Sequence, residues 1–189
     1  MFVGGMQTTG VLDRSDRGAP PAVNVTVAPQ PPATLVETGL KAGADGEWVI
    51  KTVPVEVFES TEKTFGFSMS KRATNGELDE FMVISEVEAG DEFKPGFHAV
   101  EHPYDYEGGV DEPAYGYFVG TPAKITATLD GRSVPARMTR MATTDGQPSV
   151  VVFWFDNTLV PGASRPTEVT AFDAAGKQLA RVSIPYEGG

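Results

Sequence analysis

Apolar and polar residues alternate with a period of two along most of the chain from Glu47 onward. Three runs show this most clearly, with apolar side chains at Val53, Val55 and Val57, at Phe65, Phe67 and Met69, and at Ile125, Ala127 and Leu129. The pattern is typical of β-strands that bury one face. Pro54 interrupts the first run and cannot donate a backbone hydrogen bond, so we expect that strand to lie at a sheet edge or to carry a bulge.

Turn residues connect these runs into hairpins. Asp130-Gly131 favours a tight two-residue turn, because both central positions of such a turn adopt positive φ. The segment from Asp173 to Gly176 predicts a second, longer hairpin connection. Between these hairpins, the continuously apolar run from Ser149 to Asn157 predicts a central strand that is buried on both faces or flanked by a closing sheet.

The predicted fold is therefore an all-β antiparallel β-sandwich, immunoglobulin-like in a loose sense, with an extended N-terminal arm. We expect about eight short strands, because no helical stripe continues over three turns between residues 47 and 186. Residues 1–39 are rich in proline and glycine and predict a tether, which leaves residues 40–189 as one domain. Within the tether, the strictly alternating segment Val23 to Val27 predicts a strand that is able to add to a sheet edge.

Negative charge is concentrated in one part of the chain. The 189 residues include no cysteine and carry a net charge of −11; twelve acids and a single base, Lys94, lie between Glu77 and Glu112, and the rest of the chain is neutral. Such a surface repels nucleic acid and favours cations or basic partners. No apolar run reaches the roughly 18 residues of a membrane helix, and no secretory signal is recognisable, so we expect either an intracellular protein or one whose anchor or signal precedes Met1.

Four motifs follow one another in a distinctive order: Gly46-Glu47-Trp48, the long run from Tyr115 to Arg132, Phe153-Trp154-Phe155, and the run from Val169 to Lys177. From about residue 45 to residue 186 the chain thereby resembles the outer, C-terminal domains of single-pass membrane proteins of high-GC Gram-positive bacteria, some of which carry an anti-sigma-factor-like part. The resemblance implies an extracytoplasmic domain, membrane-anchored or secreted, that binds or senses, and it carries over no catalytic residue; a cytoplasmic location stays open. Such domains often hold a cysteine pair, which this chain lacks.

The two histidines, His98 and His102, lie four residues apart, with Glu101 between them and Asp105 beyond. On a helix this spacing would allow both imidazoles to bind one zinc ion. However, Pro103 disfavours the helical conformation at His102, and on a strand the two side chains would stand about 13 Å apart. We therefore expect no metal ligands here, and keep as an alternative a metal-dependent hydrolase that uses His98, His102 and nearby acids.

Other chemical signals in the sequence are weak. Asp105, Glu107, Asp111 and Glu112 surround Gly108-Gly109 and leave Ca²⁺ open as a ligand, although the spacing of an EF-hand is missing. The dense acids permit a catalytic carboxylate pair without indicating one, and the chain has no nucleophile elbow, phosphate loop or dinucleotide fingerprint. We expect neither a cofactor nor enzymatic activity.

Aromatic residues between Phe93 and Phe118 are interleaved with glycine and acids rather than with valine and isoleucine. Because tyrosine offers a large contact area and loses little rotamer freedom, this composition favours a recognition loop. We predict a binding or sensing module for a protein or cell-envelope ligand of basic character, and a structural subunit that assembles through its N-terminal arm is a further alternative. The predicted ligand-binding residues are Tyr104, Asp105, Tyr106, Glu107, Asp111, Glu112 and Tyr115, although Tyr115 and Tyr117 also alternate as a strand with one face in the core.

Overall fold

The structure, a computed structural model, describes residues 35–56, 63–85, 93–101, 112–129, 131–141, 146–156, 159 and 167–184. These residues form strands and turns without helices, which confirms the predicted all-β class. Within these ranges there is accordingly no apolar helix that is long enough to cross a membrane. The predicted strand at residues 23–27 lies outside them.

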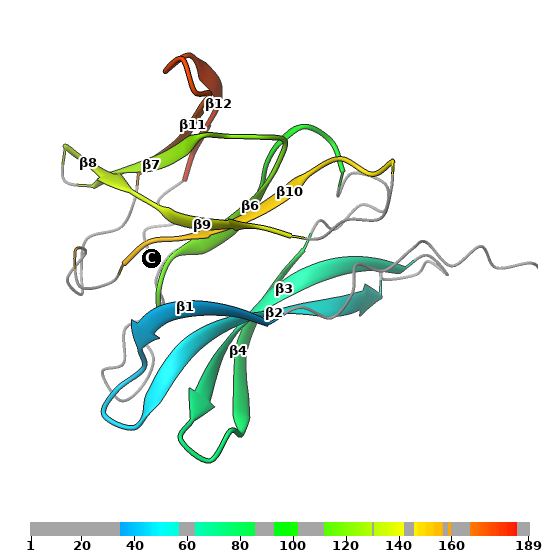
Figure 1. The fold of residues 1–189 in the computed structure, drawn as a ribbon, viewed down its shortest axis with the longest axis vertical. Coiled ribbons are helices and arrows are strands. Elements are labelled where there is room, and N and C mark those ends of the chain that lie inside the picture. The colour runs from blue at the N-terminus through cyan, green and yellow to red at the C-terminus, as the bar shows by residue number, and fades with distance from the viewer. Residues whose placement is uncertain are drawn as a thin grey trace, which may run out of the picture.

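The described strands form three antiparallel sheets of four strands each (Figure 1). The lower sheet of Figure 1 contains, in spatial order, β1 (Leu35–Lys41), β2 (Gly46–Glu56), β3 (Lys63–Ala73) and β4 (Leu78–Ser85). The central sheet contains β5 (Gly96–Glu101), β6 (Tyr115–Val119), β10 (Val150–Trp154) and β9 (Arg137–Arg140). The upper sheet contains β12 (Gln178–Ser183), β11 (Glu168–Phe172), β7 (Lys124–Leu129) and β8 (Arg132–Pro135).

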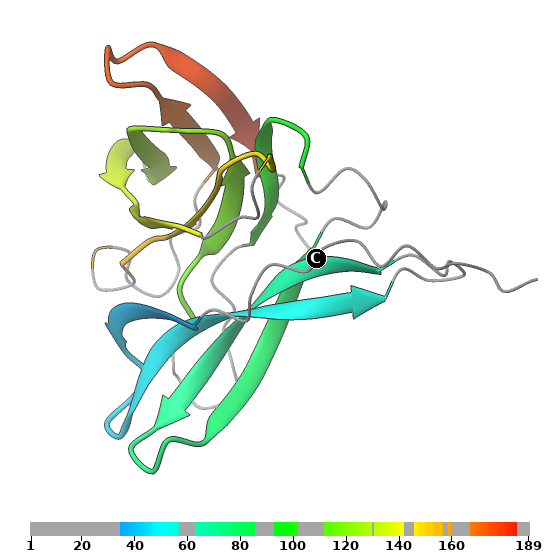
Figure 2. The ribbon, with the colours of Figure 1, turned by 45° about the vertical axis from the view of Figure 1, so that its right-hand side comes forward.

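The central sheet is buried on both faces because its inner strands alternate between two cores. Every residue of β6 and β10 is buried, as predicted for the apolar run that contains β10. Tyr117, Val152 and Trp154 belong to the core shared with the lower sheet, whereas Phe118 and Phe153 belong to the core shared with the upper sheet. The predicted sandwich is thus formed by the central and upper sheets, and the lower sheet adds a third layer (Figure 2).

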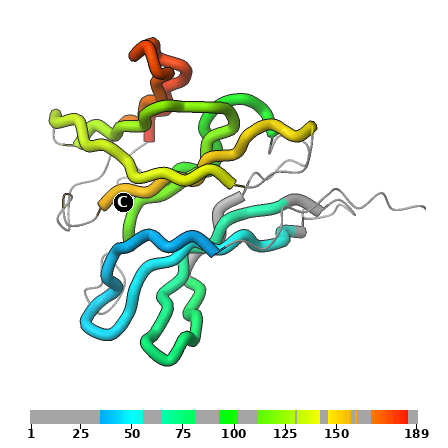
Figure 3. Tube along the Cα trace, viewed as in Figure 1, coloured from blue at the N-terminus to red at the C-terminus, as the bar shows by residue number. Residues whose placement is uncertain are grey.

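Two predicted hairpins build the upper sheet. Leu129 pairs with Arg132, and Gly131 has a φ of 74°, which confirms the tight turn between β7 and β8. In the turn between β11 and β12, the Asp173 carboxylate accepts hydrogen bonds from the backbone N–H groups of Ala175 and Lys177. β8 and β9 follow one another almost without interruption, so the chain crosses directly from the upper to the central sheet (Figure 3).

The lower sheet corrects two details of the sequence prediction. β1 begins at Leu35, within the expected tether of residues 1–39, because Val36 and Leu40 alternate with exposed residues and pack into the core. In β2, Trp48 and Ile50 face the central sheet, so that Val53, which is buried as expected, lies at an odd position on the opposite face. Pro54 lies beyond Lys51, where the described pairing of β2 with β1 ends, and this position is compatible with its missing N–H group.

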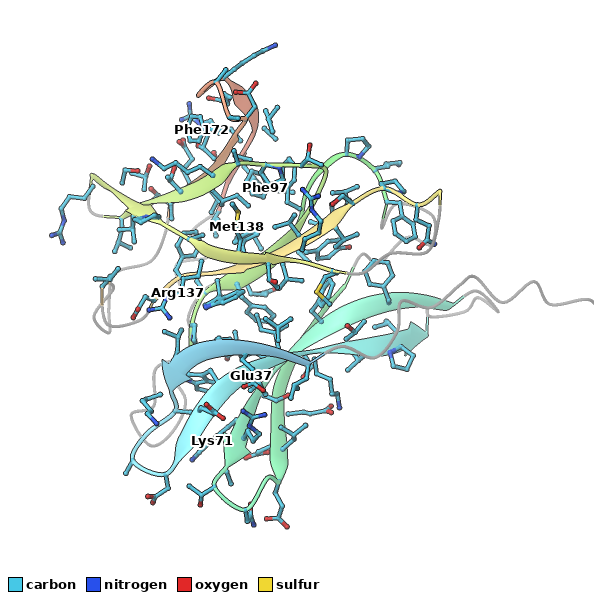
Figure 4. The ribbon with its side chains drawn as sticks, viewed as in Figure 1. Glu37, Lys71, Phe97, Arg137, Met138 and Phe172 are labelled. Atoms are coloured by element: carbon cyan, nitrogen blue, oxygen red, sulfur yellow. The ribbon has the colours of Figure 1, made fainter. Side chains whose placement is uncertain are left out.

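Polar contacts fasten the lower sheet to the central sheet beside β1. A bulge between Glu37 and Leu40 leaves the Thr38 carbonyl free to accept hydrogen bonds from Trp154 Nε1 and Arg137 Nη1, each at 3.2 Å. Figure 4 shows Arg137 between β9 and β1, and its other Nη atom donates to Asp156 at 2.7 Å. Apolar contact and directional hydrogen bonds therefore hold the two layers together.

The outer face of the lower sheet is covered by charged side chains that reach across neighbouring strands. Arg72 of β3 forms ion pairs with Glu37 of β1 and Glu47 of β2, and Lys51 of β2 pairs with Glu80 of β4. Small residues on this face of β3 leave room for these long side chains, and Ser68 and Ser70 are fully buried. Ion pairs therefore cross this face, and Leu35 and Leu78, which pair with Lys51 and Arg72 in the sheet, are partly exposed beside them.

Candidate functional site

The predicted recognition segment joins β5 to β6, and a bulge shapes the point from which it leaves. Ala99 and Val100 of β5 lie opposite Gly116 alone in β6, and Ala99 adopts a φ of 42°. A β-carbon on Gly116 would lie 2.8 Å from Phe153 Cζ and 3.2 Å from Val100 Cα. Only glycine therefore fits beneath the bulge without displacement of its neighbours.

The bulge changes the face toward which the end of β5 points. His98 pairs with Tyr117, and Glu101 pairs with Tyr115 after the extra residue. Because directly paired residues share one face of a sheet, Glu101 lies on the same side as Tyr115, toward the lower sheet. Without the bulge, Glu101 would alternate onto the opposite face. The irregularity thus brings a carboxylate beside the start of β6.

Tyr115 is a core residue that links two layers. It is fully buried, and its hydroxyl accepts a hydrogen bond from the Met69 N–H of β3 at 3.2 Å and lies 3.4 Å from the Phe67 carbonyl. A register shift after Met69 in the pairing of β3 with β4 accompanies this contact. Burial raises the pKa of the Tyr115 hydroxyl well above its ordinary value. Tyr115 therefore lies in the core rather than on a surface that a ligand would meet.

Glu112, which precedes β6, is buried as well. Only 3% of the surface of this residue is exposed to solvent, and its Oε1 atom is buried without a hydrogen-bond partner. Burial and, to a smaller extent, the negative charge of Glu101 raise the pKa of Glu112 from 4.5 to about 7. The structure thus brings together Glu101, Glu112 and Tyr115 at the two ends of segment 102–111.

The remaining predicted ligand-binding residues lie outside the described part of the chain. They are Tyr104, Asp105, Tyr106, Glu107 and Asp111. What the structure does place are the residues on either side of them, Glu101 and Glu112, on the two neighbouring chain segments of the central sheet.

His98 has a structural environment. Its ring stacks on Tyr117, with ring centroids 5.0 Å apart and an interplanar angle of 11°, and its Nε2 atom lies 2.6 Å from the Lys94 carbonyl. The side chain is buried. His102, its expected partner in the alternative zinc site, is outside the described ranges, and the described residues contain no cluster of three or more metal-ligating side chains.

Sequence reasoning missed two residues that define this region. Glu101 was considered only as a neighbour of the histidines, and Gly116 only as part of the run from Tyr115 to Arg132. A signal for Gly116 exists in the sequence, because an isolated glycine inside a strand often marks a bulge or a close approach. No comparable signal predicts that Glu112 is buried, since an acid next to a turn is typically solvated.

Comparison with protein-family models, with curated proteins and with solved structures gives no match to this chain.

Proposed function

We propose that this protein is a non-catalytic binding or sensing module that recognises a basic protein or cell-envelope ligand through segment 102–111. The observation that carries the proposal is that both ends of this segment are attached to the doubly buried central sheet. Recognition residues are often placed on a loop whose ends are fixed by a rigid scaffold, because the scaffold lowers the entropy lost on binding.

The composition of the segment supports a basic ligand. It contains Tyr104 and Tyr106 together with three acids, and it follows other acids of the negative stretch between Glu77 and Glu112. Tyrosine side chains supply contact area, and the carboxylates attract cationic groups at a distance and fix their orientation at contact. Glu112 and Tyr115 act in this proposal as supports of the segment, not as ligand contacts.

An extracytoplasmic location is part of the same proposal. It is supported by the resemblance of residues 45–186 to the outer domains of single-pass membrane proteins and by the proline-rich composition of residues 1–34, which suits a stalk. Fusion of the native coding region, with its upstream sequence, to a reporter that is active only outside the cytoplasm would test it. Reporter activity only inside the cell would contradict this part of the proposal.

A matched pair of variants tests the binding function. The first carries Tyr104→Ser, Asp105→Asn, Tyr106→Ser and Glu107→Gln, and the control carries Glu77→Gln and Asp79→Asn; both lose two negative charges. The probe is a set of fluorescent peptides of graded lysine and arginine content, and binding is followed by anisotropy at two salt concentrations. We expect the wild type and the control to bind the basic peptides in a salt-sensitive manner, and the first variant to lose binding without a change in Tm.

Two results would overturn the proposal: no binding of any basic peptide by the wild type, or an equal loss of binding in both variants. The second result would mean that net charge, rather than segment 102–111, determines binding. A large fall in Tm of the first variant would instead assign these tyrosines to the core.

A further inference from the structure

Glu112 is the only acidic residue that is almost completely buried in the described part of the chain. Exposed acids elsewhere in the negative stretch, such as Glu77 and Asp79, have water around them. Burial of an ionised carboxylate costs several kcal/mol unless hydrogen bonds or a cation compensate it. The partners of Glu112 therefore determine its charge.

Among the described residues, no hydrogen bond to Oε1 and no cation compensates the burial of Glu112. Within the described part of the chain, the titratable groups that interact with it are the Glu101 carboxylate on β5 and the Tyr115 hydroxyl on β6. One of these is negative and the other is neutral, so both the geometry and the charges disfavour an ionised Glu112.

We propose that Glu112 is a proton-operated switch at the base of the β5–β6 pair: it holds a proton in the folded protein, and loss of that proton weakens the pairing of β5 with β6. The inference goes beyond the proposed binding function and does not depend on a ligand. The raised pKa of Glu112, about 7, is consistent with it and places the change near neutral pH.

The position of Glu112 explains why its ionisation would act on this strand pair. After loss of the proton, two like charges would stand at the end of β5 and just before β6, and the charge on the buried Glu112 would have little water to screen it. The bulge at Ala99–Val100 already interrupts the ladder beside Glu101, so few regular backbone hydrogen bonds hold this end of β5. The buried charge of Glu112, with a smaller repulsion from Glu101, is therefore expected to act first on the strand end from which segment 102–111 leaves.

Stability and local opening are measured as a function of pH for the wild type and three variants. Glu112→Gln removes the switch and keeps the shape of the side chain, Glu101→Gln removes the neighbouring charge, and Asp45→Asn removes an exposed carboxylate as a control. Urea unfolding gives the folding equilibrium constant. Hydrogen exchange, corrected for intrinsic exchange rates, reports the local opening of β5 and β6. A ¹³C NMR titration of Glu112 measures its protonation directly.

The wild type and Asp45→Asn should lose stability between pH 5 and pH 8 relative to Glu112→Gln, by roughly 50- to 100-fold in the folding equilibrium constant. Glu101→Gln should keep most of this loss, since burial contributes more than Glu101 does. Exchange of β5 and β6 amides should accelerate over the same range in the wild type and not in Glu112→Gln. Parallel stability curves for the wild type and Glu112→Gln would overturn the proposal. If Glu112→Gln does not fold, the NMR titration of the wild type decides, and a midpoint near 4.5 would overturn the proposal.

Discussion

Removal of the Tyr115 hydroxyl separates a core role of this residue from a role in ligand recognition. Tyr115→Phe leaves the ring in place and removes the acceptor that the Met69 N–H of β3 uses at 3.2 Å. A typical buried hydrogen bond contributes about 1 kcal/mol, and a buried donor left without a partner costs about 1 to 3 kcal/mol. Since the Met69 N–H can partly recover another partner by small shifts, we expect the free energy of unfolding to fall by about 1 to 2 kcal/mol, and Tm to fall by about 2 to 8 °C.

Urea unfolding followed by tryptophan fluorescence measures this loss, because Trp48 and Trp154 lie in the same core as Tyr115. Ser149→Ala is the matched control: it removes a hydroxyl whose Oγ atom is buried and has no hydrogen-bond partner, so its free energy of unfolding should change by less than about 0.5 kcal/mol. A Tyr115→Phe protein as stable as the wild type would refute the assignment of this hydroxyl as a link between the layers. Loss of ligand binding at unchanged stability would return Tyr115 to the recognition surface.

Four further outcomes are expected. Gly116→Ala should destabilise the protein by about 1 to 3 kcal/mol in urea unfolding, because its β-carbon would stand 2.8 Å from Phe153 Cζ; a loss below about 0.5 kcal/mol would contradict the fit of glycine beneath the bulge. Wild-type stability should fall as the pH rises from 4.5 through 7 and level off above it, because the folded protein retains the proton of Glu112 over this range and the unfolded chain does not. This contribution is at most about 3.4 kcal/mol, and a rise in wild-type stability relative to Glu112→Gln over the same range would contradict its sign. Calcium should shift Tm by less than about 1 °C relative to chelator at matched ionic strength, whereas an increase of roughly 5 to 10 °C would identify a cation site among the acids. Deletion of residues 1–34 should leave the number of chains per particle unchanged in sedimentation equilibrium, as expected for a tether. A change in oligomeric state would instead support assembly through the arm.

The period-two alternation was sufficient to predict the fold class, and the continuously apolar run from Ser149 to Asn157 was sufficient to predict the buried strand β10. Strand patterns report local burial, and the turn residues around Gly131 and Gly176 have strong conformational preferences, so these features are determined by near neighbours. The same reasoning could have found the β3–β4 hairpin, because Asn75-Gly76 stands at its turn and Gly76 has a φ of 88°.

The third layer could not be predicted in this way. Alternation shows that a strand has two faces, but it does not show which face meets which sheet, and in β2 the larger side chains of Trp48 and Ile50 rather than Val53 face the central sheet. β1 was overlooked because a threonine, Thr38, occupies one of its buried positions and interrupts the apolar pattern. The burial of Glu112 and the bulge in β5 that turns Glu101 toward the lower sheet are tertiary properties, which the neighbouring residues in the sequence do not determine.

The layered arrangement also limits where this protein can bind a partner. Both faces of the central sheet are occupied, and on the outer face of the lower sheet Arg72 and Lys51 already pair with glutamates across the strands. A partner that docked on this lower face would have to cover or break these ion pairs. Connections at the ends of strands do not carry this cost. The segment between β5 and β6 combines aromatic residues, negative charge and an attachment to the most buried sheet. Glu112, the acidic residue that follows this segment, is buried just before β6. For these reasons we expect ligand binding by segment 102–111 to depend on pH near neutrality. The Glu112→Gln variant should still bind the ligand but lose this pH dependence.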